Sequence, residues 1–454
     1  MESNDKQFIK MTETPISKLI FSLSVPTIIS MLVTAFYNTA DTFFVSKLGT
    51  SASGAVGVVF SIMAIIQAVG FTIGMGSGAW ISRLLGKKDK EKASEVASTG
   101  LFVGIVIGCI LTAMGLVFLS PLMKILGATD TVLPYAKDYA RYILFGSPIM
   151  ITTFVLNNIL RSEGKARFAM IGITAGGLLN IALDPFFIFT LNLKTSGAAI
   201  ATLISQCIGV VLLFIPFILK KTDVKLCIKK IKVFSSTPLI ILKNGLPSLC
   251  RQGLASVSSI FLNNAASVYG DPALSAMSIV GKIFMMLFSV ILGFGQGYQP
   301  VAGYNYSAGN LNRVRKAALF MLLVSHISVI ILGGAAIIFA PNIIKLFIDN
   351  DSEVIKIGTA ALIAQSIALQ FIPLGVLCNM TFQSIGKSWT ASILSSLRQG
   401  VFFIPLILLL PKWFNIFGVE IAQAVADVLN FFVAIPFFIW FLKSLKKIDQ
   451  KQTQ

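Results

Sequence analysis

Long apolar runs recur along almost the whole of this 454-residue chain, and they constrain its fold more than any other feature. A helix needs about 20 apolar residues to cross the hydrocarbon of a bilayer, which is roughly 30 Å thick. Glycines, prolines and charge clusters divide the chain into twelve segments of that kind. Only 12% of the residues are charged, whereas soluble proteins average about 25%. The sequence therefore predicts an all-α integral membrane protein with twelve transmembrane helices, near residues 16–45, 53–82, 94–120, 133–160, 165–190, 197–219, 240–268, 273–304, 315–340, 354–383, 387–410 and 417–443.

The remaining charges indicate which ends of these helices face the cytoplasm. Lys and Arg gather at the termini and in alternate loops, among them 83–92, 161–167 and 220–239. Loops rich in Lys and Arg stay on the cytoplasmic side, so both termini are predicted to be cytoplasmic, in a multi-pass protein of the cell (inner) membrane. Topology thus accounts for the net charge of +18, and the bilayer, not nucleic acid, is the expected partner.

The two halves of the sequence repeat each other. Pro26 matches Pro247 at an offset of 221 residues, and "SEGK" from Ser162 matches "SIGK" from Ser384 at an offset of 222. Each half holds six segments, so both halves enter the membrane in the same direction, as two parallel repeats. This pattern predicts a transporter made of an N-lobe and a C-lobe around a central cavity.

The repeat also predicts domain boundaries. We expect a monomer with a cytoplasmic tail at 1–15, an N-lobe at 16–219, a cytoplasmic linker at 220–239, a C-lobe at 240–443 and a second tail at 444–454.

Four polar residues inside apolar segments of the N-lobe form a candidate ion site. Asn180 and Asp184, in the stretch "NIALDP", lie four residues apart and share one helix face. With a rise of about 1.5 Å per residue, Asp41 and Thr202 fall at a similar depth, in the outer half of the bilayer. Intramembrane charges cost at least a few kcal/mol and usually face a partner or a pathway. Two carboxylates, an amide oxygen and a hydroxyl suit a small cation, such as Na⁺, or a shared proton.

A structural reading of the same residues stays open. Asp184 could bond to backbone at a kink made by Pro185, and Asp41 could lie at the outer water interface. The second half argues against a scaffold role, because the positions matching Asp41, Asn180 and Asp184 are Leu262, about Phe402 and about Leu406. Pro26 can bend the first helix, and a static kink shared with Pro247 is an equal alternative.

The C-lobe carries cations instead of acids. We expect Arg251, Lys282 and Arg398 to be buried and to form structural ion pairs, with Glu420 and Asp427 as partners. His326 is the only histidine, and the chain has no phosphate-binding loop. We therefore expect no enzyme activity and no cofactor, and transport driven by an ion gradient.

The chain resembles the multidrug and toxic compound extrusion (MATE) family, specifically its DinF-like branch. The stretches that carry the resemblance are "SVPTIISMLVTAFYNTADTFFVSKLG", "SRLLGKKD", "LRSEGKAR", "LLNIALDPFFIF" and "GAAIATLISQ". The resemblance implies a secondary active antiporter that exports amphipathic, mostly cationic drugs in exchange for H⁺ and/or Na⁺. It also implies a network for that ion in the N-lobe, made by Asp41, Asn180, Asp184 and Thr202, and a bending role for Pro26.

The position of the drug-binding site is a separate expectation. We expect it in the N-lobe near Tyr37, Asn157 and Asp41, where ion binding at the carboxylates would weaken a bound cation. The cationic residues of the C-lobe keep an alternative open, namely a flippase for lipid-linked sugars or other lipids from the same superfamily.

Overall fold

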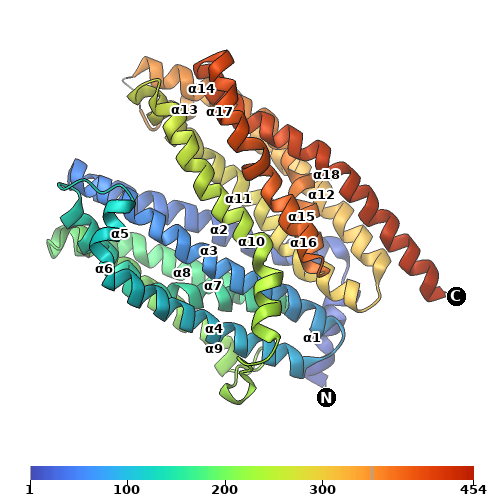
Figure 1. Cartoon of the computed structure of the whole chain (residues 1–454). Coiled ribbons are helices and arrows are strands. Elements are labelled where there is room, and N and C mark those ends of the chain that lie inside the picture. Colours follow the sequence, from blue (N-terminus) through green and yellow to red (C-terminus); the bar gives the residue numbers. More distant parts are fainter. Residues whose placement is uncertain (1, 349–350, 454) are drawn as a thin grey trace. The chain divides into compact units, whose positions relative to one another are not determined.

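The computed structural model describes residues 2–348 and 351–453, and the regular structure in that part of the chain is helical (Figure 1). Its first half contains α1 (Glu2–Glu13), α2 (Ile16–Ser46), α3 (Thr50–Gly86), α4 (Lys90–Val117), α5 (Leu119–Ile125), α6 (Leu133–Phe145), α7 (Ser147–Ser162), α8 (Ala166–Pro185), the π-helix η1 (Phe186–Thr190) and α9 (Lys194–Ile218). The second half contains η2 (Ile228–Lys230), α10 (Thr237–Ser267), α11 (Asp271–Ser307), α12 (Leu311–Ile338), α13 (Ala340–Lys345), α14 (Ser352–Ala368), η3 (Leu369–Phe371), α15 (Ile372–Ser384), α16 (Ser388–Ser396), the π-helix η4 (Leu397–Phe403), α17 (Ile404–Phe414) and α18 (Ile416–Thr453).

Most of these helices are long and apolar enough to cross a membrane. Ten of the described spans meet that condition singly, and α6 with α7 forms an eleventh that is bent by 49°. The helix α10 is 31 residues long but is not among them, since it carries polar residues such as Lys243, Asn244 and Arg251. With α10 included, the helices form two sets of six, and the predicted fold class is confirmed.

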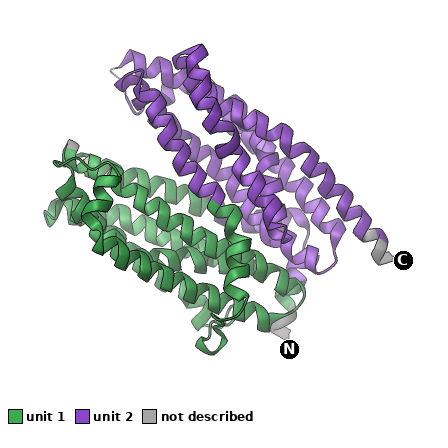
Figure 2. Ribbon diagram, in the orientation of Figure 1, with its two compact units in different colours: residues 1–8, 29–249 green, residues 9–28, 250–454 purple. Residues whose placement is uncertain are grey.

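The chain divides into two compact units, coloured separately in Figure 2. Unit 1 contains residues 1–8 and 29–249, and unit 2 contains residues 9–28 and 250–454. The start of α2 therefore belongs with the second half of the sequence, and the start of α10 belongs with the first. Both changes of unit come within three residues of a repeated proline, Pro26 in α2 and Pro247 in α10.

Close packing of glycines explains this exchange of helix starts. A Cβ on Gly76 of α3 would lie 2.8 Å from the backbone nitrogen of Gly245 in α10. A Cβ on Gly297 of α11 would lie 2.7 Å from the Cα of Ser24 in α2. These two contacts correspond in the repeat, since 76 matches 297 and 24 matches 245. Each approach is too close for a side chain, so glycine is needed for the helices to meet.

The linker between the halves packs on the polar face of α4. Ser94 and Ser98, one helical turn apart, accept hydrogen bonds from the backbone nitrogens of Lys225 and Cys227, both at 3.0 Å. Thr99 accepts another from the nitrogen of Lys232 at 3.0 Å. These hydroxyls satisfy the backbone of a segment that has little secondary structure of its own.

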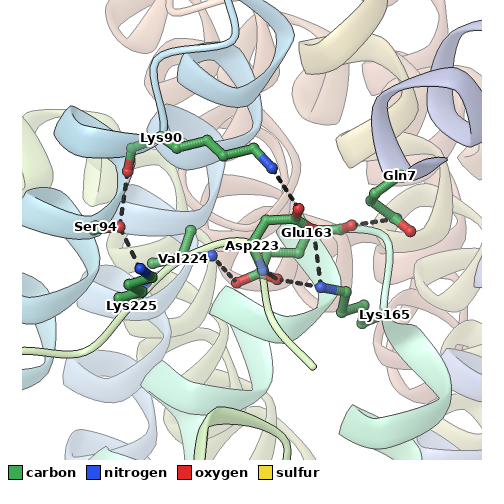
Figure 3. Close-up of polar contacts among 8 residues, drawn as sticks. All are labelled: Gln7, Lys90, Ser94, Glu163, Lys165, Asp223, Val224 and Lys225. Atoms are coloured by element: carbon green, nitrogen blue, oxygen red, sulfur yellow. Dashed lines mark hydrogen bonds and ion pairs between the residues drawn. The ribbon is translucent and has the colours of Figure 1, made fainter. Parts of the chain in front are cut away.

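A buried carboxylate, Glu163, lies where the linker meets the α7–α8 loop (Figure 3). Its side chain accepts from the backbone nitrogens of Asp223 at 2.8 Å and Val224 at 3.3 Å, and it pairs with Lys165 at 2.9 Å. Asp223 in turn pairs with Lys90 at 2.8 Å and Lys165 at 2.9 Å. Burial raises the pKa of Glu163 in spite of the Lys165 charge. Burial also opposes ionisation of Asp223, but the bonds from Lys90 and Lys165 hold the pKa of Asp223 below 3.8.

Candidate ion-coupling site

The four polar residues expected to form an ion site come from three helices of unit 1. Asp41 lies on α2, Asn180 and Asp184 lie on α8, and Thr202 lies on α9. All four are buried, with exposed fractions of 8, 3, 0 and 4% in that order. Polar groups at such burial need partners or a ligand.

A pair of hydrogen bonds joins three of these residues. The Asn180 amide nitrogen donates to Asp184 Oδ1 at 3.2 Å and to Thr202 Oγ1 at 3.3 Å. The helical spacing of Asn180 and Asp184 does bring them onto one face, and that face meets α9. A single amide thus holds a carboxylate and a hydroxyl together.

Asp41 is held by a residue that the sequence did not suggest. The hydroxyl of Tyr139, on α6, donates to Asp41 Oδ2 at 2.9 Å, and Tyr139 itself is fully buried. Its position belongs to a buried stripe that includes Ala136, Ala140 and Ile143. The one available signal was a phenol hydroxyl at a core position of that stripe, since a buried Tyr usually finds a partner.

Three buried oxygen atoms at this site have no hydrogen-bond donor among the described residues. They are Asp41 Oδ1, Asn180 Oδ1 and Asp184 Oδ2. Buried acceptors without donors are costly, and all three atoms are of the type that binds Na⁺ or a proton. These three oxygen atoms could therefore serve as ligands for a small cation or share a proton.

The Asp-Pro step lies at a change of helix type. Pro185 ends α8, and the π-helix η1 follows, with the Leu191 nitrogen donating to the Phe186 carbonyl at 3.0 Å. A proline has no N–H to give to the carbonyl four residues earlier, and π-helical turns are frequent at functional sites. The carboxylate of Asp184 is thus carried by the last regular turn before an irregular one.

The two residues expected beside a drug differ in their surroundings. Tyr37 lies one helical turn before Asp41 and packs on Gly177 of α8, whose Cβ would come within 3.0 Å of the Tyr37 ring. Asn157 is buried on α7 and donates to the Ala169 carbonyl at 3.1 Å. Asn379, its match in the repeat, donates to the Ala391 carbonyl at 2.8 Å. That shared bond is sufficient to explain an asparagine at both positions.

Unit 2 has no such acid cluster at the matching positions. Leu262, Phe402 and Leu406 pack against its hydrophobic core instead. The expected ion pairing there is correct for Arg398, which binds Asp427 at 2.6 Å. The expected burial of Lys282 is wrong, because its position on α11 is exposed in this structure.

Known proteins resemble this chain over almost its full length. The sequence profile of the MatE family matches residues 26–186 and 247–409. Multidrug export protein MepA of Staphylococcus haemolyticus is 28% identical over 449 residues, 98% of each chain. A solved MATE in the straight conformation is 28% identical with a TM-score of 0.91, and one in the bent conformation is 28% identical with a TM-score of 0.89. Each structural match covers 98% of this chain and 99% of the other. The chain is thus a multi-pass membrane protein that belongs to the MatE family of multidrug and toxic compound extrusion transporters.

Proposed function

We propose that this protein is a secondary active multidrug efflux antiporter. It exports amphipathic, mostly cationic organic compounds in exchange for H⁺ and/or Na⁺ entering through unit 1. Its relative from Staphylococcus haemolyticus is named as a multidrug export protein, which supports the drug class. The proposed orientation has both termini in the cytoplasm, on the basis of the Lys and Arg distribution.

The observation that carries the proposal is a set of three buried oxygens that no donor in the described part of the chain reaches, namely Asp41 Oδ1, Asn180 Oδ1 and Asp184 Oδ2. A proton or Na⁺ there would neutralise part of the charge and satisfy these acceptors. Tyr139, Thr202 and the Asn180 amide hold the ligands in place, so little ordering remains to be done when the ion binds.

Antiport requires that ion and drug bias the same conformational equilibrium in opposite directions. We propose Pro26 as the point where α2 bends between the two states, since the helix changes unit two residues later. Solved MATE structures with straight and bent conformations support a bend of this kind. Asp41 lies on the outer part of α2, so bending would change its distance from the α8 pair.

Dye export in cells that express the protein tests the proposal. Efflux of a fluorescent organic cation should require the protein and should stop when an ionophore collapses the H⁺ gradient, the Na⁺ gradient or both. The ionophore that stops export identifies the coupling ion. Export that survives the collapse of both gradients would rule out ion-driven antiport.

A further inference from the structure

The linker between α9 and α10 carries two sets of apolar side chains. Val224 is fully buried, and Leu226 packs on a cluster of residues from α7, α8 and α9. Phe234 and Ile228, in contrast, are 107 and 86% exposed, and Val233 is 39% exposed. One set of apolar groups thus fastens the linker to unit 1, and the other set lies on the outer surface.

The length of α4 indicates how deep this outer surface lies. At about 1.5 Å per residue, the 28 residues of α4 extend about 42 Å. That is about 12 Å, or about eight residues, more than a hydrocarbon layer of roughly 30 Å. The far end of α4 is apolar, with Val117 75% exposed, whereas its first six residues include four charged ones. The excess therefore belongs to the charged start, and Ser98 and Thr99 lie at the border of the hydrocarbon.

Hydrogen bonds hold the exposed part of the linker at that border. Ser98 Oγ accepts from the backbone nitrogen of Cys227, and Thr99 Oγ1 accepts from that of Lys232, both at 3.0 Å. The exposed apolar residues follow these two positions directly in the chain. They therefore lie where lipid head groups meet acyl chains, the depth at which interfacial segments bury their apolar side.

Lysines accompany these apolar groups. The segment 224–236 contains no acid and four lysines, namely Lys225, Lys229, Lys230 and Lys232. Two acids of α4 lie beside it: Glu91 pairs with Lys230 at 2.7 Å and also attracts Lys225. Glu95 pairs with Lys92 at 2.6 Å and also attracts Lys232. With both acids and Lys92 included, the surface keeps an excess of three positive charges.

The ion cluster just before this segment does not offset that excess. Its two acids, Glu163 and Asp223, pair with two lysines (Figure 3). The positive charge of the segment is therefore available to an anion outside the chain.

We infer that segment 224–236 binds anionic phospholipids of the membrane in which the protein lies. The lysines bind the lipid phosphates, and Ile228, Val233 and Phe234 enter the edge of the acyl region. A basic residue near an anionic leaflet strengthens binding about fivefold, so several lysines at one depth favour a charged lipid over a zwitterionic one. Lipid binding can be measured without transport, so this inference does not rest on the antiport proposal.

Matched lipids test the inference on the full-length protein in neutral detergent. Dioctanoyl phosphatidylglycerol and dioctanoyl phosphatidylcholine have the same tails and differ in net charge, and glycerol 3-phosphate supplies an anionic head group alone. We expect phosphatidylglycerol to bind about tenfold or more tightly than either of the others. Equal affinity for the two lipids would overturn the inference. Glycerol 3-phosphate or a short DNA duplex that binds as tightly as phosphatidylglycerol would overturn the assignment to a membrane lipid.

A triple variant of the linker locates the binding. Lys225→Gln/Lys229→Gln/Lys232→Gln changes exposed side chains and keeps every backbone nitrogen that bonds to α4, so the protein should fold. The affinity for phosphatidylglycerol should fall about tenfold or more, while that for phosphatidylcholine should change little. Phosphatidylglycerol affinity equal to that of the wild type would refute the site.

Two further variants separate the site from net charge and test its apolar part. Lys47→Gln/Lys124→Gln/Lys194→Gln removes three exposed lysines from other parts of unit 1 and should leave phosphatidylglycerol affinity unchanged. A loss equal to that of the linker variant would reduce the effect to net charge and refute the site. Phe234→Ser keeps all the lysines and should weaken both lipids about tenfold, because a large apolar side chain no longer leaves water. Lipid affinities unchanged by Phe234→Ser would contradict the proposed depth.

Discussion

The two units share one helical plan but carry opposite chemistry. Unit 1 has buried acids where unit 2 has leucines that pack on its core, and unit 2 has two arginines and an aspartate where unit 1 has serine, glycine and glutamine. The matched positions are Asp41 and Leu262, Asp184 and Leu406, Ser30 and Arg251, Gly176 and Arg398, and Gln206 and Asp427. Corresponding helices form with either member of each pair. The shared helical plan therefore does not by itself require these charged groups.

Removing an acid from unit 1 should have the largest effect. We expect Asp184→Asn and Asp41→Asn each to abolish gradient-driven dye export while the protein still folds and inserts, because a neutral amide relieves the cost of a buried charge. Export assays at matched expression, with thermal unfolding of the purified variants, measure this. Asp138→Asn, an exposed acid beside Tyr139, is the control and should export normally. Normal export by both site variants would refute the proposed ion site.

Ion and drug should weaken each other's binding if they bias one equilibrium. We expect the affinity for a cationic drug in detergent to fall at low pH or at high Na⁺, because either ion neutralises carboxylates that favour the drug. The dependence should flatten in Asp41→Asn. Wild-type affinity that stays constant in both titrations would exclude coupling through these carboxylates.

Placing an acid in unit 2 tests whether the units are interchangeable. Leu406 packs on the core of unit 2, and Leu262 offers no second carboxylate. Leu406→Asp should therefore create no working site and should lower stability by roughly 1–3 kcal/mol, the cost of a buried polar group without partners. Expression level and thermal unfolding report this cost. A stable variant with more ions exchanged per drug would show that either unit can couple.

Tyr139→Phe tests whether the hydrogen bond from Tyr139 to Asp41 in unit 1 contributes to ion coupling. The variant removes the donor to Asp41 Oδ2 but keeps the ring. We therefore expect the free energy of unfolding to fall by about 1 kcal/mol. The ion dependence of export should shift, because Asp41 loses its fixed orientation. If export and its ion dependence match the wild type, Tyr139 only fills space.

The smallest effect concerns the linker. Unit 1 has Glu163 where unit 2 has Ile385, and Asp223 of the linker joins the Glu163 cluster through Lys165. The pKa of Asp223 is held below 3.8, so its ion pairs stabilise the fold above that pH and are lost as pH falls. Asp223→Asn should lower stability at neutral pH by at most about 1 kcal/mol, and the difference from wild type should close in acid. A difference that does not change with pH would assign the effect to packing.

Much of this arrangement followed from local patterns in the sequence. Hydropathy located the spans, and α2 and α8 begin within one residue of the segments predicted from 16 and 165. The i, i+4 spacing of Asn180 and Asp184 correctly predicted a shared face, since helix periodicity is a local property. Tyr139 could not be predicted in this way, because nothing along α6 specifies which helix its hydroxyl will meet.

The sequence by itself determined which segments are helical, that they repeat, and which half holds acids or arginines. Tertiary structure decided that Tyr139 meets Asp41 and that the starts of α2 and α10 belong to the opposite units. The physical reason is that composition and periodicity act over a few turns of one helix. Contacts between helices depend instead on close packing between positions far apart in the sequence. At Gly76 and Gly245, for example, a side chain on either residue would prevent the close approach of the two helices.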